Sequence, residues 1–115
     1  QNIEKFGAGN VTIIPGKAPA VLDEIKEKVD KVIIGGTGGQ LEAVFIWCKE
    51  HLNPGGRLAA NFVTMENASL ATTLMRKYFT DVDMIQVGVS RGEFIGGLTM
   101  LKASNPIFII TGSVE

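Results

Sequence analysis

The strongest constraint on the fold is an apolar run that passes through glycines into an amphipathic segment. Val32, Ile33 and Ile34 are followed by glycine at four of the five positions 35–39, and residues 40–51 have the apolar spacing of a helix. A strand that ends in glycines before a helix is typical of open α/β folds, which bind ligands at the carboxyl ends of their strands. Because glycine has no Cβ atom, a ligand could approach this backbone closely. We therefore expect a ligand-binding α/β domain.

Two nucleotide-binding interpretations of this loop fail on spacing. A P-loop requires Gly-Lys-Ser/Thr at the start of its helix, whereas Gly39 is followed by Gln40 and Leu41. A dinucleotide-binding fingerprint requires a third glycine at the position of Leu41. A purely structural role, a tight passage from strand to helix, stays open. So does the binding of a carboxylate or a polarised oxygen at the amino terminus of the helix.

The composition limits the class of protein. The chain has 115 residues, of which 45% are apolar, and its 11 basic side chains are balanced by 12 acidic ones. We expect one domain over residues 1–115, without the charge that attracts nucleic acid or anionic membranes. The single Cys48 cannot form an internal disulfide, and no apolar run reaches the roughly 18 residues of a membrane span. We therefore expect a cytoplasmic protein with no metal site and no nucleic-acid or membrane partner.

Hydrophobic periodicity predicts alternating strands and helices. Residues 2–6 resemble the end of a helix capped by Gly7, which suggests that an amino-terminal part is missing. We expect a connection above the sheet over residues 91–105, and the two final strands, which have no helix between them, as an antiparallel pair. The predicted strands are 11–14, 31–34, 57–63, 84–90 and 107–110, and the predicted helices are 19–29, 40–51 and 66–78, the last capped by Thr64.

Few residues offer classical catalytic chemistry. His51 is the only histidine, and at the end of a predicted helix it complements the helix dipole better than it serves as a base. Polar residues instead follow two predicted strands at the edge where such sheets bind ligands, and Arg91 is the sharpest candidate because a guanidinium can hold a carboxylate through two hydrogen bonds. These candidates are Asn61, Thr64, Ser90, Arg91, Gly96 and Gly97.

Several stretches of the chain resemble one family and follow one another in the order that the family has. Taken together they are similar to the decarboxylating precorrin-6Y C5,15-methyltransferases of cobalamin biosynthesis, specifically the part that methylates C15 and decarboxylates C12. The resemblance covers essentially the whole chain. The stretches are residues 10–14 with 16–19, 34–39, 52–58, 90–92 with 96–97, and 105–106.

The resemblance implies a class I S-adenosylmethionine-dependent methyltransferase with a Rossmann-like sheet whose last strand is reversed. It implies that Gly16, Lys17 and Ala18 lie beside the adenine of the cofactor, and that Gly35, Gly36 and Thr37 border its methionine end. Lys17 departs from the acidic residue common in relatives and cannot accept a hydrogen bond from the adenine amino group.

On the substrate side, the resemblance places the six polar and glycine candidates against a precorrin tetrapyrrole, whose carboxylate arms suit Arg91. It also implies a homo-oligomer and a possible C5-methylating partner subunit or domain. Whether the substrate contains cobalt stays open, and no residue is assigned to the decarboxylation.

In that family, two further strands come before the position of Gln1 in the sequence. In the sheet, these two strands lie between the strand of residues 11–14 and the strand of residues 31–34. The chain is then an incomplete domain, and its open strand edge would either pair residues 11–14 with residues 31–34 or associate with another chain. Alternatives to the enzyme are a noncatalytic α/β interaction module and a nucleotide-binding domain.

Overall fold

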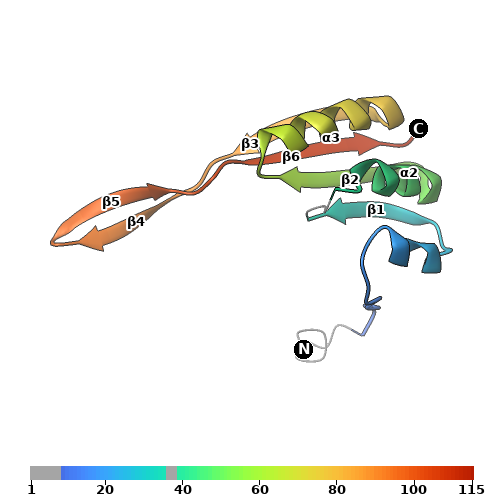
Figure 1. Cartoon of the computed structure of the whole chain (residues 1–115), viewed down its shortest axis with the longest axis horizontal. Coiled ribbons are helices and arrows are strands. Elements are labelled where there is room, and N and C mark those ends of the chain that lie inside the picture. Colours follow the sequence, from blue (N-terminus) through green and yellow to red (C-terminus); the bar gives the residue numbers. More distant parts are fainter. Residues whose placement is uncertain (1–8, 36–38) are drawn as a thin grey trace.

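The computed structural model describes residues 9–35 and 39–115 and consists of a four-stranded mixed sheet, two helices on one of its faces and a projecting hairpin (Figure 1). The sheet has the strand order β1-β2-β6-β3, and β4 and β5 form a separate two-stranded sheet. The elements are η1 (Ala20–Glu24, a 3-10 helix), β1 (Val29–Ile34), α2 (Leu41–His51), β2 (Leu52–Phe62), α3 (Met65–Tyr78), β3 (Thr80–Val87), β4 (Ser90–Ile95), β5 (Leu98–Ala103) and β6 (Ile107–Ser113).

Strand directions follow the predicted connections. β1 and β2 are parallel and are joined through α2, as expected for a strand-helix-strand unit. β6 is antiparallel to both β2 and β3, which confirms the predicted antiparallel pair at the carboxyl end. The parallel strands place the ends of β1 and β2, at Ile34 and Phe62, at one edge of the sheet.

The core lies between the sheet and the two helices. α2 turns Val44, Phe45 and Cys48 inward, whereas α3 places the small Ala68 and Ala71 over the sheet among larger residues. Phe45 is fully buried, and its ring meets that of Phe79 edge to face at a centroid distance of 6.0 Å. Burial of one stripe from each helix is what stabilises such short helices in a protein.

The opposite face of the sheet is open in the described chain. Ile33 is 83% exposed, whereas its neighbour Ile34, which points toward the helices, is 8% exposed. Register places Ile33 beside Ala59, and it places Ile109 beside Ile85 on this same face. Apolar side chains therefore line both faces of the sheet, although α2 and α3 cover only one.

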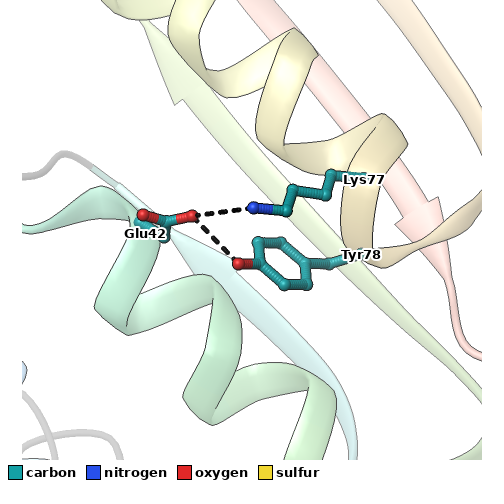
Figure 2. Close-up of polar contacts among 3 residues, drawn as sticks. All are labelled: Glu42, Lys77 and Tyr78. Atoms are coloured by element: carbon teal, nitrogen blue, oxygen red, sulfur yellow. Dashed lines mark hydrogen bonds and ion pairs between the residues drawn. The ribbon is translucent and has the colours of Figure 1, made fainter.

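A surface cluster links the two helices (Figure 2). Glu42 on α2 accepts a hydrogen bond of 2.9 Å from the Tyr78 hydroxyl, and its Oε2 lies 3.6 Å from Lys77 Nζ. The pKa of Lys77 is raised. The largest cause is its side-chain hydrogen bond with Tyr78, and the negative charge of Glu42 raises it further. Because all three side chains are accessible to water, the cluster orients α2 against α3 more than it stabilises the fold.

At the amino-terminal end of β2, the chain makes a close-packed bulge. The register jumps from Val29 opposite Leu52 to Lys31 opposite Arg57, so that residues 53–56 loop out. Val114 fixes this loop because it accepts a hydrogen bond from Gly55 N and donates one to Gly56 O. The loop is thereby tied to the end of β6.

The helix α3 begins at a side-chain cap, as predicted. Thr64 has an extended backbone, and its Oγ1 accepts a hydrogen bond of 3.2 Å from Asn67 N. We expect Thr64→Ala to lower the free energy of unfolding by about 1 kcal/mol, because an N-H at the start of the helix loses its partner. Urea denaturation measures this difference. Thr73→Ala is the matched control, since the Thr73 hydroxyl only bonds back to Ser69 O within the helix, and an equal loss there would contradict the capping role.

Two predicted elements near the amino end are wrong. Residues 11–14 form no strand and are exposed. They do not pair with β1, so the expected pairing of residues 11–14 with residues 31–34 is also wrong. The helix expected over residues 19–29 is reduced to η1, and Val29 belongs to β1. The strand and the helix expected here would each need a surface on which their apolar side chains pack. In the described chain, only Leu22 and Val29 of these two segments pack against the core. Association through the edge of β1 stays a prediction.

The expected connection over residues 91–105 is also wrong. These residues form most of the β4–β5 hairpin, which extends away from the sheet in Figure 1 instead of crossing above it. The alternating stretch predicted as a strand over residues 84–90 leaves the sheet after Val87, and β3 begins four residues earlier, at Thr80. The glycines of this stretch form a turn at Gly96 and Gly97, whose φ angles of 57° and 80° suit a two-residue hairpin.

Candidate functional site: a cleft at the end of β1

A cleft of about 450 Å³ lies where β1 ends and α2 begins. Its position at the carboxyl end of a parallel strand is where open α/β sheets bind ligands. One wall comes from the segment before η1, and the other comes from β1 and α2. The lining residues are Gly16, Lys17, Ala18, Leu22, Val32, Ile33, Ile34, Gly35, Gln40, Val44, Trp47 and Cys48.

Four of the six predicted cofactor residues share this cleft. Gly16, Lys17 and Ala18 form one wall, and Gly35 faces them from the end of β1. Gly36 and Thr37 lie outside the described residues. The structure thus brings together two stretches that are separated by η1 and β1 in the sequence.

The fold requires glycine at only one of the two described glycine positions in the cleft. Gly16 has a φ of +144°, and a Cβ atom there would lie 2.8 Å from Val21 Cγ2, so both conformation and space favour glycine. A Cβ atom on Gly35 would meet nothing within 4 Å. The open backbone at Gly35 is therefore not required by packing of the described chain.

The walls of the cleft are mostly apolar and carry little charge. Among the described lining residues, Lys17 is the single charged side chain, and Gln40 adds an amide that can both donate and accept hydrogen bonds. Burial raises the pKa of the Cys48 thiol to about 12, so this thiol is protonated at neutral pH and is a poor nucleophile.

Trp47, which lines the cleft, joins η1 to α2. Its Nε1 donates a hydrogen bond of 3.2 Å to Leu22 O, and its ring stacks on His51 at a centroid distance of 4.2 Å. His51 Nδ1 lies 2.9 Å from Trp47 O at the end of α2. His51 is therefore part of the packing of α2, and its predicted interaction with the helix dipole stays a prediction.

The six predicted substrate residues do not line this cleft. Asn61 and Thr64 lie at the carboxyl end of β2, next to the end of β1, and the hydroxyl of Thr64 is used as the helix cap. The other four lie on the hairpin, with Ser90 and Arg91 at the start of β4 and the two glycines at the tip. Arg91 instead borders a separate hollow of about 330 Å³ with Glu93 and Lys102.

Eight of the twelve lining residues of the cleft were not predicted as site residues, and three of these are of most interest. Leu22, Gln40 and Trp47 line it together with the predicted residues. Gln40 directly follows the glycine loop, so its position alone could have suggested it. Trp47 could not be found in this way, because its contact with Leu22 depends on how η1 folds.

Comparison with known proteins decides the family. A family model described as a precorrin methyltransferase domain matches residues 1–113. The chain belongs to this family. It is 37% identical to the cobalt-precorrin-6B C(15)-methyltransferase (decarboxylating) of Salmonella typhi, a match that covers 100% of this chain and 59% of that protein.

Solved structures agree with this assignment. The precorrin-6y C5,15-methyltransferase of Geobacter metallireducens GS-15 superposes with a TM-score of 0.85 and 31% identity, over 99% of this chain and 59% of that one. An S-adenosylmethionine-dependent O-methyltransferase of Thermotoga maritima, 18% identical over 98% of this chain and 43% of its own, shares the fold with a TM-score of 0.72.

The predicted methyltransferase fold and the predicted family are thus confirmed. The chain spans about three-fifths of the length of the two precorrin methyltransferases named above. None of the helices in the described ranges has the length and apolar character needed to cross a bilayer.

Proposed function

We propose that this chain provides the cofactor cleft and part of the substrate surface of an enzyme that methylates C15 of a precorrin with S-adenosylmethionine and decarboxylates it, in cobalamin biosynthesis. The observation that carries this proposal is the convergence of Gly16, Lys17, Ala18 and Gly35 on one cleft at the end of β1, in a chain of the precorrin methyltransferase family. The proposed setting is the cytoplasm.

The cleft fits the base of the proposed cofactor. Its volume of about 450 Å³ lies within the range of small-molecule sites, and Leu22, Val32 and Trp47 offer apolar surface to a flat ring. Gln40 can pair with the edge of the base, whereas Lys17 offers only donors. Among the described lining residues no carboxylate is present to bind ribose hydroxyls, so the described cleft accounts for only part of the cofactor.

The chemistry that follows is one of positioning. S-adenosylmethionine supplies an electrophilic methyl group, and the protein must align it with a carbon of the tetrapyrrole. No titrating nucleophile is needed for this step, which agrees with the protonated Cys48 and with His51 packed on Trp47.

On the substrate side, we propose that Asn61, Thr64, Ser90, Arg91 and the glycines Gly96 and Gly97 face the tetrapyrrole. The charge of Arg91 would pair with its carboxylate arms. A C5-methylating subunit or domain is the partner proposed for the methylation of C5 on the same ring system.

Isothermal titration calorimetry with S-adenosylhomocysteine tests the cleft. We expect micromolar binding by this chain and at least a tenfold weaker affinity for Gly35→Leu, because the new side chain enters the cleft without disturbing packing. Gly88→Leu is the matched control, since a Cβ atom at Gly88 also meets nothing within 4 Å and Gly88 does not line the cleft. Fluorescence of the single tryptophan, Trp47, gives a second readout at the site.

Other results would favour the other two functions. No binding of S-adenosylhomocysteine or S-adenosylmethionine would favour a noncatalytic interaction module. Binding of ATP or NAD instead, weakened by Gly35→Leu, would favour a nucleotide-binding domain. Equal weakening by Gly88→Leu would contradict the placement of the ligand in the cleft.

A further inference from the structure

The β4–β5 hairpin carries two cations that face each other across its strands. Register places Arg91 of β4 directly opposite Lys102 of β5, and directly opposed residues of an antiparallel pair share one face of the ribbon. Cβ atoms in such positions lie roughly 5 Å apart, and like charges there destabilise the pairing of the strands. Within the described ranges, Arg91 forms no ion pair. An anion bound between the two side chains would relieve this repulsion.

A hollow of about 330 Å³ lies beside the two cations, and it already holds one carboxylate. Glu93 Oε2 lies 3.4 Å from Lys102 Nζ, from the position diagonal to Lys102 across the strands. The side chains of Glu93 and Lys102 are 46% and 78% exposed, so this ion pair contributes little to stability and is readily exchanged for another. The lining residues are Arg91, Gly92, Glu93, Lys102, Ala103 and Ser104.

The same face becomes apolar toward the tip of the hairpin. Alternate residues along a strand share a face, so Ile95, Leu98 and Met100 lie on the face of the two cations. All three side chains are at least half exposed. At about 3.4 Å per residue, the row of Arg91 and Lys102 lies about 13 Å from the row that pairs Ile95 with Leu98. The face thus has cations at one end and an apolar platform at the other.

We propose that Arg91 and Lys102 form a clamp for a carboxylate arm of a tetrapyrrole, and that Glu93 pairs with Lys102 until this arm displaces it. The choice of ligand rests on the proposed function, whereas Lys102 and Glu93 are new to the substrate surface. The guanidinium of Arg91 can hold a carboxylate through two parallel hydrogen bonds, and the Lys102 ammonium adds a second charge on the same side. A tetrapyrrole has carboxylate arms around an apolar ring. It therefore matches both ends of this face, whereas an isolated anion matches only one.

Fluorescence anisotropy of uroporphyrin I tests the clamp, because this tetrapyrrole carries carboxylate arms around its rim. We expect Lys102→Met to weaken its binding about tenfold, since one charge-assisted contact is lost. Glu93→Gln is expected to have the opposite effect and to tighten binding about threefold, since Lys102 loses its competing carboxylate. Lys26→Met and Glu27→Gln are the matched controls. They change the net charge in the same way at exposed residues outside the hollow, and we expect them to leave the affinity unchanged.

Binding of S-adenosylhomocysteine to the same variants distinguishes a failure of the clamp from a failure of the proposed function. The hollow shares no lining residue with the cleft at the end of β1, so Lys102→Met should keep the affinity for S-adenosylhomocysteine. If uroporphyrin binding changes as expected but S-adenosylhomocysteine does not bind, the clamp stands and the cofactor cleft falls. If S-adenosylhomocysteine binds but Lys102→Met and Lys26→Met have equal affinities for uroporphyrin, the clamp is wrong and the cleft stands.

Two further outcomes would overturn parts of the clamp. Weaker uroporphyrin binding by Glu93→Gln would mean that Glu93 supports the ligand instead of competing with it. Acetate that displaces uroporphyrin at an equal concentration of carboxylate would show that the ring gains nothing from the apolar platform, and the ligand would then be a free carboxylate. Far-UV circular dichroism checks that both hairpin variants keep the fold, which we expect because Glu93 and Lys102 are exposed.

Discussion

Replacing Phe45 with alanine is expected to lower the free energy of unfolding by about 3–5 kcal/mol, because a fully buried ring is removed and its cavity is only partly filled. Phe45 connects α2 to Phe79 through an edge-to-face contact, so the contact between the two helix regions is lost as well. Equilibrium denaturation in urea, monitored by far-UV circular dichroism, measures the change in midpoint. A loss of this size approaches the whole stability of many domains of this length.

The neighbouring Ile46 provides the control for this experiment. Ile46 occupies the same helix but is 38% exposed, so Ile46→Ala removes far less buried surface. We expect its cost to stay below that of Phe45→Ala by about 2 kcal/mol or more. Equal costs for the two variants would mean that the contact between α2 and Phe79 contributes little, contrary to the packing described above.

Replacing Gly56 with alanine is expected to cost about 2–3 kcal/mol, since the added methyl group has no free space. Its Cβ atom would lie 2.8 Å from Asn53 O and 2.9 Å from Asp30 O, and both are backbone atoms that cannot rotate away. Relief requires the bulge at residues 53–56 to move, which also strains its hydrogen bonds with Val114. Thermal unfolding is the direct measurement.

Gly88→Ala controls for the general effect of replacing a glycine. A methyl group there meets nothing within 4 Å, so we expect a change within about 0.5 kcal/mol of zero. If Gly56→Ala were as mild as Gly88→Ala, the close packing of the bulge against Asp30 would not hold in solution.

Elements with strong local signals could be predicted from the sequence. The helix α2 begins after Gln40 and ends at His51 as expected, and α3 begins at the Thr64 cap. In both helices the apolar stripe packs on the described sheet, so local and tertiary preferences agree. The β-branched run that ends at Ile34 became β1 for the same reason.

The failure near the amino end lies where the expected partner surface is absent from the described chain. Ile13 and Ile14 have the composition of a strand but no neighbouring strand to pair with. The connection expected above the sheet over residues 91–105 fails for a different reason: Gly96 and Gly97 have the positive φ angles of a tight turn, so this segment forms a hairpin. Turn geometry, rather than composition, decided that segment.

The candidate site could be predicted only in part. The residues around Gly16 and Gly35 were named from the family resemblance, and the structure places the described ones on one cleft. Their spacing alone could not have joined them, because η1 and β1 separate the two stretches in the sequence. The roles of Asn61, Thr64, Ser90, Arg91 and the tip glycines stay predictions.

The open face of the sheet has a consequence for how the chain responds to temperature. Ile33 and Ile85 expose apolar surface there, and the attraction between such surfaces is mainly entropic near room temperature. It therefore weakens on cooling and strengthens when sulfate or phosphate salts are added. Any apolar surface that covers this face is therefore expected to be held more weakly in a cold, sulfate-free solution than in a warm one. Because Ile33 and Ile85 are exposed, the solubility of this chain is expected to depend on temperature and salt as well as on its fold.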